Sequence, residues 1–122
     1  LFGISGFSPL ARQHAVDTIM PDVKHCGGLL ELTRIGAMAA AEGVMVAPHN
    51  PSGPVSTAAS VQVCAGMKNV NYLELQYGEV DWRSGVLTPP ERFTNGRIQV
   101  PDRPGFGIEL NEAVIRARAL PL

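Results

Sequence analysis

The chain has 122 residues, of which 45% are hydrophobic, and its 10 Lys and Arg residues nearly balance its 11 Asp and Glu residues, for a formal net charge of −1. This near-neutral balance argues against nucleic acid or an anionic membrane surface as the main partner. The hydrophobic content is too high for a disordered chain, and no run approaches the roughly 18 consecutive apolar residues that a membrane-spanning helix needs.

The first residues and the cysteines indicate the setting of the protein. The chain begins LFGISGF, without an initiator Met and directly in apolar sequence, which is typical of the middle of a larger domain. We therefore expect part of a longer protein. No secretory signal opens the chain, and Cys26 and Cys64 lack metal-ligand spacing, so we predict buried free thiols in a reducing, cytoplasmic compartment.

From the start of the chain to Gly78, predicted helices alternate with predicted strands. After a loop at 1–7, the expected helices cover residues 8–16 (with Pro9 at the first helical position), 29–41 and 55–67. The expected strands are short and apolar, and they cover residues 18–24, 44–47 and 72–75. Because parallel strands need a crossover of a dozen or more residues, this order predicts a three-stranded parallel sheet in an α/β fold.

After Gly78 the pattern changes to polar and proline-rich sequence. Asn95-Gly96 predicts a tight hairpin, residues 101–107 are expected to be extended, and residues 110–120 are expected to form a terminal helix. We therefore divide the chain into a partial barrel at residues 1–78 and a C-terminal extension with its terminal helix at residues 79–122.

Each predicted strand ends in a side chain that can handle protons or charge: Asp22, His49 and Glu74. In closed parallel barrels, chemistry collects at the carboxyl ends of the strands, so we expect these three residues to line one mouth of a barrel. His49 can act as a general acid or base, Asp22 can hold its tautomer, and Glu74 can assist an oxyanion. The alternatives are a His bonded to a loop carbonyl, an Asp that caps the next helix and a partly exposed Glu.

Four further residues are predicted to contact a substrate: Lys24, His25, Pro51 and Trp82. Lys24 can meet a substrate carboxylate, and the alternative is a solvated lysine at the rim. Trp82, together with Arg83, can cover the site as a lid, and the alternative is a packing role.

Four segments resemble the C-terminal part of enzymes in the mandelate racemase-like branch of the enolase superfamily: PDVKHCGG, APHNPSGP, YLELQYGE and PDRPGFGIELNE. In that branch an Asp on the sixth barrel strand and a His on the seventh form an acid/base dyad, and a Glu on the eighth assists. The resemblance carries these roles to Asp22, His49 and Glu74. It implies the last three strands of a modified (β/α)7β barrel, with a C-terminal tail that packs toward a capping domain.

The PHNPSGP loop is most similar to that of galactonate dehydratase-like sugar-acid dehydratases. The resemblance implies Mg²⁺-assisted removal of a proton α to a carboxylate, through an enediolate, with loss of the β-hydroxyl. The metal ligands would precede Leu1, with none in this chain. The implied substrate is an acid sugar, and the implied partners are the rest of the barrel, the capping domain and further copies in a homo-oligomer. A racemase or epimerase of the same superfamily, or a truncated barrel piece without catalytic activity, stays open.

Overall fold

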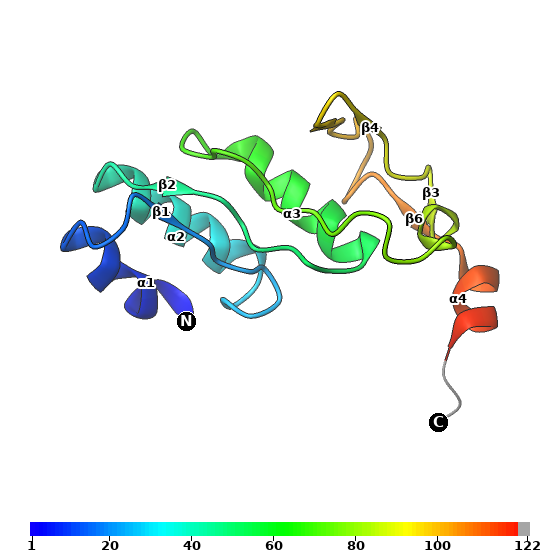
Figure 1. Cartoon of the computed structure of the whole chain (residues 1–122), viewed down its shortest axis with the longest axis horizontal. Coiled ribbons are helices and arrows are strands. Elements are labelled where there is room, and N and C mark those ends of the chain that lie inside the picture. The colour runs from blue at the N-terminus through cyan, green and yellow to red at the C-terminus, as the bar shows by residue number, and fades with distance from the viewer. Residues whose placement is uncertain (120–122) are drawn as a thin grey trace.

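The computed structural model describes residues 1–119 of the chain. The helices are α1 (Gly3–Arg12), α2 (Leu29–Ala41), α3 (Pro54–Gly66), the 3-10 helix η1 (Arg83–Gly85) and α4 (Glu112–Arg118). The strands are β1 (Thr18–Ile19), β2 (Met45–Val46), β3 (Leu87–Thr88), β4 (Phe93–Thr94), β5 (Arg97–Ile98) and β6 (Glu109–Leu110). The molecule is elongated, with α1, α2, β1 and β2 at one end, α3 in the middle, and β3 to β6 with α4 at the other end (Figure 1).

The two longest helices confirm the sequence prediction, whereas α1 corrects it. Helix α2 has the predicted bounds and is followed by Gly43 in the left-handed region, and α3 differs from its prediction by one residue at each end. Helix α1 begins at Gly3, five residues before the predicted start, and Pro9 lies inside it. The early start is possible because the first free N–H groups find tertiary partners: Gly3 donates to the Cys26 carbonyl at 2.9 Å, and Ile4 donates to Oε1 of Glu31 at 2.9 Å.

The parallel sheet is shorter than predicted because prolines interrupt its ladder. Strands β1 and β2 pair in parallel, with Thr18 opposite Met45 and Ile19 opposite Val46. Pro21 follows β1 and Pro48 follows β2, and neither has an N–H to donate. The carbonyl groups of these prolines still accept: the His49 N–H donates to the Pro21 carbonyl at 3.2 Å.

The third predicted strand, 72–75, is not formed. A single parallel bridge joins Val46 to Val70, and the Asn71 N–H donates to the Val46 carbonyl at 3.0 Å. The next bond in a regular ladder would need an N–H at Pro48, so regular pairing stops there. The segment nevertheless stays beside β2, because the Glu74 N–H donates to the Pro48 carbonyl at 3.2 Å.

The core lies where α1, α2 and α3 meet the paired strands. Its members are buried apolar side chains that recur at helical spacing or alternate with the sheet: Phe7, Ala11, Ile19, Val23, Cys26, Leu32, Ile35, Ala39, Val44, Val46, Ala59 and Val63. Cys26 is a buried free thiol as predicted, and Cys64 is a free thiol that is only partly buried. This core fixes the ends of β1 and β2 relative to α2 and α3.

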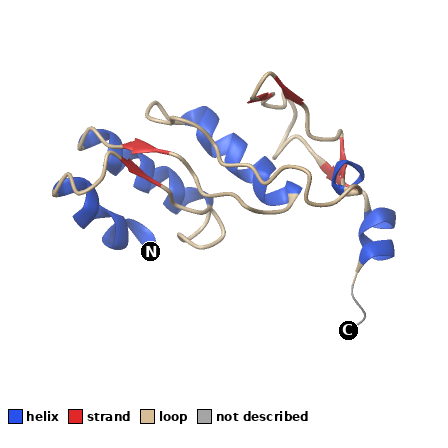
Figure 2. Cartoon of the chain, viewed as in Figure 1, coloured by secondary structure: helices blue, strands red, loops and turns tan. Residues whose placement is uncertain are grey.

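The second half of the chain forms small antiparallel pairs, which lie at the opposite end of the molecule from β1 and β2 (Figure 2). The Asn95-Gly96 turn joins β4 and β5, with φ of 51° and 72°, so the predicted hairpin is confirmed. Strand β3 pairs with β6 across about twenty residues, a contact that local sequence does not indicate. Helix α4 is shorter than the predicted 110–120: Asn111 caps its start through the Val114 N–H, and the helix ends at Arg118; Leu120 lies outside the described residues.

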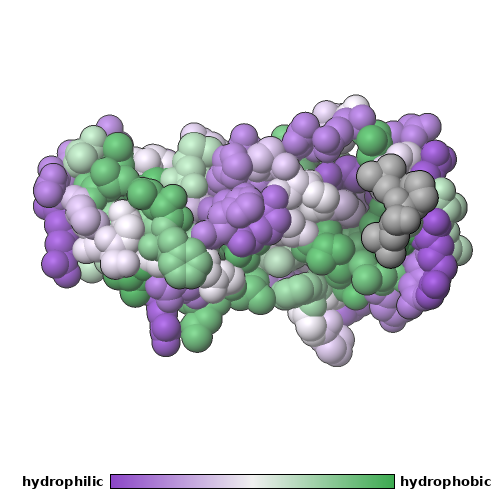
Figure 3. All heavy atoms as spheres, turned by 90° about the horizontal axis from the view of Figure 1, so that it is seen from below, coloured by the Kyte–Doolittle hydropathy of each residue, from purple (hydrophilic) through white to green (hydrophobic). Residues whose placement is uncertain are grey.

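Large apolar side chains also reach the surface, and Figure 3 shows several hydrophobic (green) patches on the face that it displays. The exposed members are Leu1, Phe2, Val16, Met20, Leu29, Leu30, Val55, Tyr72, Tyr77, Val80, Val100 and Leu110. Within residues 1–119, no helix is long and apolar enough to cross a bilayer. The division of the chain at residue 79 stays a prediction.

Candidate active site

The three predicted catalytic residues follow parallel backbone segments that lie side by side. Asp22 comes three residues after β1, His49 comes three residues after β2, and Glu74 ends the segment that accompanies β2. The backbone bonds from His49 to Pro21 and from Glu74 to Pro48 hold the three segments in register. All three side chains therefore emerge at the same edge, as the sequence predicted.

Asp22 and His49 form a hydrogen-bonded pair. Nδ1 of His49 lies 3.0 Å from Oδ2 of Asp22. The Asp22 side chain is only 6% exposed, whereas that of His49 is 45% exposed. The other oxygen of Asp22 accepts a hydrogen bond from the Lys24 N–H at 2.7 Å, which holds the carboxylate at the start of the 23–28 turn. A buried carboxylate is thus aimed at an accessible imidazole.

The ionisation of Asp22 determines which imidazole nitrogen carries the proton. Burial raises the pKa of Asp22, but hydrogen bonds from His49 and the Lys24 N–H, together with the charges of Lys24 and His25, outweigh burial and lower it below 3.8. An ionised carboxylate only accepts hydrogen bonds, so Nδ1 of His49 carries the shared proton. Nε2 is then the atom that can take up or release a proton.

Glu74 lies on the opposite side of the imidazole from Asp22. Its Oε2 atom is 4.0 Å from Nε2 of His49, which is longer than a hydrogen bond but close enough for direct electrostatic interaction. The same oxygen accepts a hydrogen bond from the Asn50 N–H at 3.3 Å. The imidazole is therefore flanked by two carboxylates from two different backbone segments.

The predicted substrate-contacting residues lie in turns and loops: Lys24 and His25 follow Asp22, Pro51 follows His49, and Trp82 directly precedes η1. Nζ of Lys24 is 3.8 Å from Oδ2 of Asp22, and its side chain is partly open to solvent. His25 and Pro51 are exposed, and Trp82 is half-buried. Among residues 1–119, no hydrogen bond joins the side chain of His25 or Trp82 to Asp22, His49 or Glu74. Their contact with a substrate stays a prediction.

A buried polar network lies behind the site, and the sequence did not reveal it. Arg83 does not reach over the site as a lid, because its guanidinium contacts Glu91, the Ser52 carbonyl and the Thr57 hydroxyl. Thr57 also accepts a hydrogen bond from Asn50. The opposite charges of Arg83 and Glu91 were visible in the sequence, but no periodic pattern in this proline-rich segment indicates that they meet.

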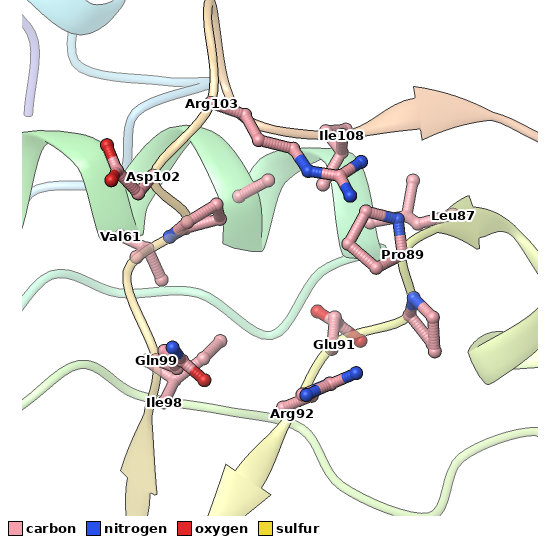
Figure 4. Close-up of a pocket in the computed structure, with 13 residues that line it drawn as sticks. Val61, Leu87, Pro89, Glu91, Arg92, Ile98, Gln99, Asp102, Arg103 and Ile108 are labelled. Atoms are coloured by element: carbon pink, nitrogen blue, oxygen red, sulfur yellow. The ribbon is translucent and has the colours of Figure 1, made fainter.

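A cavity of about 250 Å³ lies between α3 and residues 87–108. Figure 4 shows Val61 of α3 on one side, and Glu91, Arg92, Gln99, Asp102 and Arg103 around the opening. Asp22, His49 and Glu74 are not part of its lining. The predicted catalytic edge is therefore separate from this cavity.

The described residues do not by themselves fit a magnesium site. Within residues 1–119, no group of three or more His, Cys, Asp or Glu side chains has an arrangement that could hold a metal ion. The two carboxylates near the imidazole already interact with His49, Lys24 and Asn50. That the metal ligands precede Leu1 stays a prediction.

Nearly the whole chain matches one protein family. Residues 1–114 match the family described as enolase C-terminal domain-like, and the chain belongs to this family. This confirms the resemblance to the enolase superfamily that the PDVKHCGG and APHNPSGP segments carry.

The similar proteins with assigned activities include sugar-acid dehydratases. The D-xylonate dehydratase of Haloferax volcanii is 33% identical over 92% of this chain, and the D-galactonate dehydratase of Verminephrobacter eiseniae is 37% identical over 93%. A solved structure of a candidate L-alanine-DL-glutamate epimerase from Burkholderia xenovorans, bound to magnesium and fumarate, has a TM-score of 0.87 at 32% identity over 96% of this chain. The chain spans 27% and 31% of the two dehydratases and 29% of the epimerase chain.

Proposed function

We propose that this chain forms the acid/base part of a sugar-acid dehydratase, an enzyme that removes the proton α to a carboxylate and expels the β-hydroxyl. The observation that carries the proposal is the row of Asp22, His49 and Glu74 at one edge, with Nδ1 of His49 3.0 Å from Asp22. The similarity to two sugar-acid dehydratases supports the reaction class.

In this proposal His49 transfers a proton, and Asp22 orients the imidazole ring of His49. Because Asp22 keeps the proton on Nδ1, Nε2 of His49 faces the substrate and delivers a proton to the departing hydroxyl. The negative charge of Asp22 also stabilises the protonated imidazole before that transfer. Glu74 contributes a hydrogen bond or a proton from the other side, and Lys24, His25, Pro51 and Trp82 contact the acid sugar.

The proposal places the remaining machinery outside this sequence, including the base on the opposite face of the substrate that takes up the α-proton while His49 protonates the departing hydroxyl. Mg²⁺, which would stabilise negative charge on a substrate carboxylate, is assigned to ligands on other barrel strands. Leu29, Leu30 and Tyr72 are large apolar side chains that are more than a third exposed, as expected of faces that other barrel elements cover. The rest of the barrel, the capping domain and further copies of the enzyme are the proposed partners.

The first experiment replaces the imidazole in the complete protein that carries this sequence. His49→Asn keeps a polar side chain of similar width but cannot shuttle a proton. With Mg²⁺ and a panel of acid sugars, we expect kcat to fall about 10²- to 10⁴-fold. His14→Asn is the matched control, because His14 is exposed and Asn tolerates its positive φ of 47°. Undiminished dehydration by His49→Asn, with Mg²⁺ still essential, would show that the role assigned to His49 is wrong.

The same pair of side chains also supports racemisation or epimerisation, and the similarity to a candidate epimerase favours this second function. Product analysis in D2O separates the two reactions. Formation of a keto acid indicates dehydration, whereas deuterium at the α-carbon without a keto acid indicates racemisation. If the complete protein turns over none of the acid sugars with Mg²⁺, the barrel piece has no such catalytic activity.

A further inference from the structure

Arg83 is the most highly connected side chain behind the catalytic edge. It donates four hydrogen bonds: Nε to Oε2 of Glu91 at 2.8 Å, Nη2 to Oε1 of Glu91 at 3.0 Å, Nη1 to the Ser52 carbonyl at 2.7 Å and Nη2 to Oγ1 of Thr57 at 2.9 Å. Four of the five guanidinium N–H groups are thereby used. Arg83 joins residues 83–91 to the loop that follows His49.

The charge of Arg83 is neutralised inside the protein. Arg83 and Glu91 are only 11% and 7% exposed, and their bidentate pairing is the geometry in which a guanidinium and a carboxylate interact most strongly. Glu91 fixes the plane of the guanidinium, and that plane sets which atoms its outer edge can reach. The outer edge reaches Ser52 and Thr57.

The Thr57 hydroxyl links Arg83 to the catalytic edge. It accepts one hydrogen bond from Arg83 and another from Nδ2 of Asn50 at 2.9 Å, and it donates to the Gly53 carbonyl at 3.4 Å. All of its hydrogen-bonding capacity is used, so its orientation is determined by its partners. Asn50 is fully buried and follows His49 directly in the chain.

Asn50 in turn holds Glu74. Nδ2 of Asn50 donates to the Glu74 carbonyl at 3.2 Å, and the Asn50 N–H donates to Oε2 of Glu74 at 3.3 Å. A continuous series of hydrogen bonds therefore runs from Arg83 through Thr57 and Asn50 to the carboxylate that lies 4.0 Å from His49.

We propose that Arg83 is a positioning residue for Glu74 and His49, and that it acts through Thr57 and Asn50 without touching the substrate. This inference rests on the proposed acid/base function of those two residues. Arg83 sets the conformation of residues 50–57, and that conformation places the Glu74 carboxylate beside the imidazole. Lysine cannot replace it, because an ammonium group cannot pair with Glu91 in a bidentate manner and also reach Ser52 and Thr57.

A purely stabilising role for Arg83 makes a different prediction, and Arg83→Lys separates the two. This variant keeps the positive charge beside Glu91, so the protein should remain folded, but it loses the fork of hydrogen bonds. The control is Arg116→Gln, which removes an exposed ion pair with Glu112 far from the site.

Hydrogen-exchange mass spectrometry on the complete protein gives a readout that does not depend on activity. Residues 48, 51 and 54 are prolines, which have no backbone N–H to exchange. Exchange in the segment 48–53 therefore reports only on the amides of His49, Asn50, Ser52 and Gly53. We expect Arg83→Lys to speed exchange in this segment about fivefold or more, with little change at β2. Unchanged exchange at 48–53, or equal acceleration throughout the protein, would overturn the proposal.

Kinetics supply the second readout. We expect Arg83→Lys to lower kcat about 10- to 100-fold, as a small misplacement of reacting groups does, while KM stays close to that of the unmodified protein. Full activity in Arg83→Lys would overturn the positioning role. If the unmodified protein acts on no acid sugar, the proposed function fails, and the exchange result alone decides whether Arg83 orders the 50–57 loop.

A second variant covers the case in which Arg83→Lys fails to fold. Thr57→Val removes the shared hydroxyl but leaves the Arg83–Glu91 pair and the shape of the side chain intact. It should reproduce the faster exchange at 48–53 and the loss of kcat. If Thr57→Val changes neither, the series of hydrogen bonds does not position Glu74 and the proposal is wrong.

Discussion

Nδ1 of His49 and Oδ2 of Asp22 lie 3.0 Å apart, although 27 residues separate them in the chain. Helix α2, with 13 residues, accounts for about half of that separation, and the β1–β2 pairing brings the two ends together. The contact depends on the parallel pairing of β1 with β2, which places Asp22 and His49 at matching positions, three residues after each strand. A proline follows each strand, and because it has no N–H the regular pairing ends there. The pair is thus a direct product of the βαβ unit.

Replacing Asp22 tests the orienting role of this contact. Asp22→Asn keeps an oxygen for the Lys24 N–H but loses the negative charge and the obligate acceptor for Nδ1 of His49. In the complete protein we expect kcat to fall by about 10²-fold or more, because the imidazole loses its fixed tautomer. Steady-state kinetics measure the effect, with the exposed Asp17→Asn as control. A loss of activity in the control as large as in Asp22→Asn would point to a general charge effect.

The lowered pKa of Asp22 predicts a pH dependence of stability. A carboxyl whose pKa is lower in the folded state than in the unfolded state stabilises the fold above the unfolded value of 3.8, and the stabilisation is lost as pH falls through the folded value. The difference in unfolding free energy between the unmodified chain and Asp22→Asn should therefore be largest near neutral pH and shrink below about pH 4. Urea denaturation at several pH values measures it. A difference that is constant from pH 7 to pH 3 would contradict the prediction.

The two thiols should be unreactive in the folded chain. Burial raises the pKa of Cys64 to about 11 and also raises the pKa of Cys26. At pH 8 the thiolate fraction of Cys64 is then about a hundredfold smaller than for an unburied thiol with a pKa of 9.0. We expect a disulfide reagent to react with Cys64 about 100-fold more slowly in the native chain than in the chain in urea, and with Cys26 more slowly as well. Equal rates in the two states would show that the thiols are accessible.

Gly27 should be intolerant of a side chain. Its φ is +119°, and an added Cβ would lie 3.0 Å from Cβ and Cγ of Glu31. Because Gly27 lies in the turn between Asp22 and α2, Gly27→Ala should lower the free energy of unfolding by about 1–3 kcal/mol. Gly66→Ala is the matched control, since its Cβ would meet open space at the end of α3, and it should be neutral or slightly stabilising. Thermal denaturation compares the two, and equal melting temperatures would refute the strain argument.

The confirmed predictions of secondary structure are those that depend on residues close together in the sequence. The spacing of Leu32, Ile35 and Ala39 predicts α2, and the Asn95-Gly96 pair predicts the hairpin, because each pattern acts within a few residues. The start of α1 and the strand at 72–75 were wrong. The start of α1 depends on the hydrogen bond from Ile4 to Glu31, which lies 27 residues further along the chain. The strand at 72–75 depends on the segment after β2, where Pro48 has no N–H to continue the pairing beyond the Val46–Val70 bridge.

By itself the sequence determined α2, α3 and the parallel pairing of the two strands before them, and with these the common edge at which Asp22 and His49 emerge. That much follows from chain periodicity and from the crossover that parallel strands require. Only the tertiary structure decided how Arg83 and Glu91 pair and how Thr57 and Asn50 connect them to Glu74. Hydrogen bonds between irregular segments leave no periodic pattern in the sequence, so they can be identified only in the folded structure.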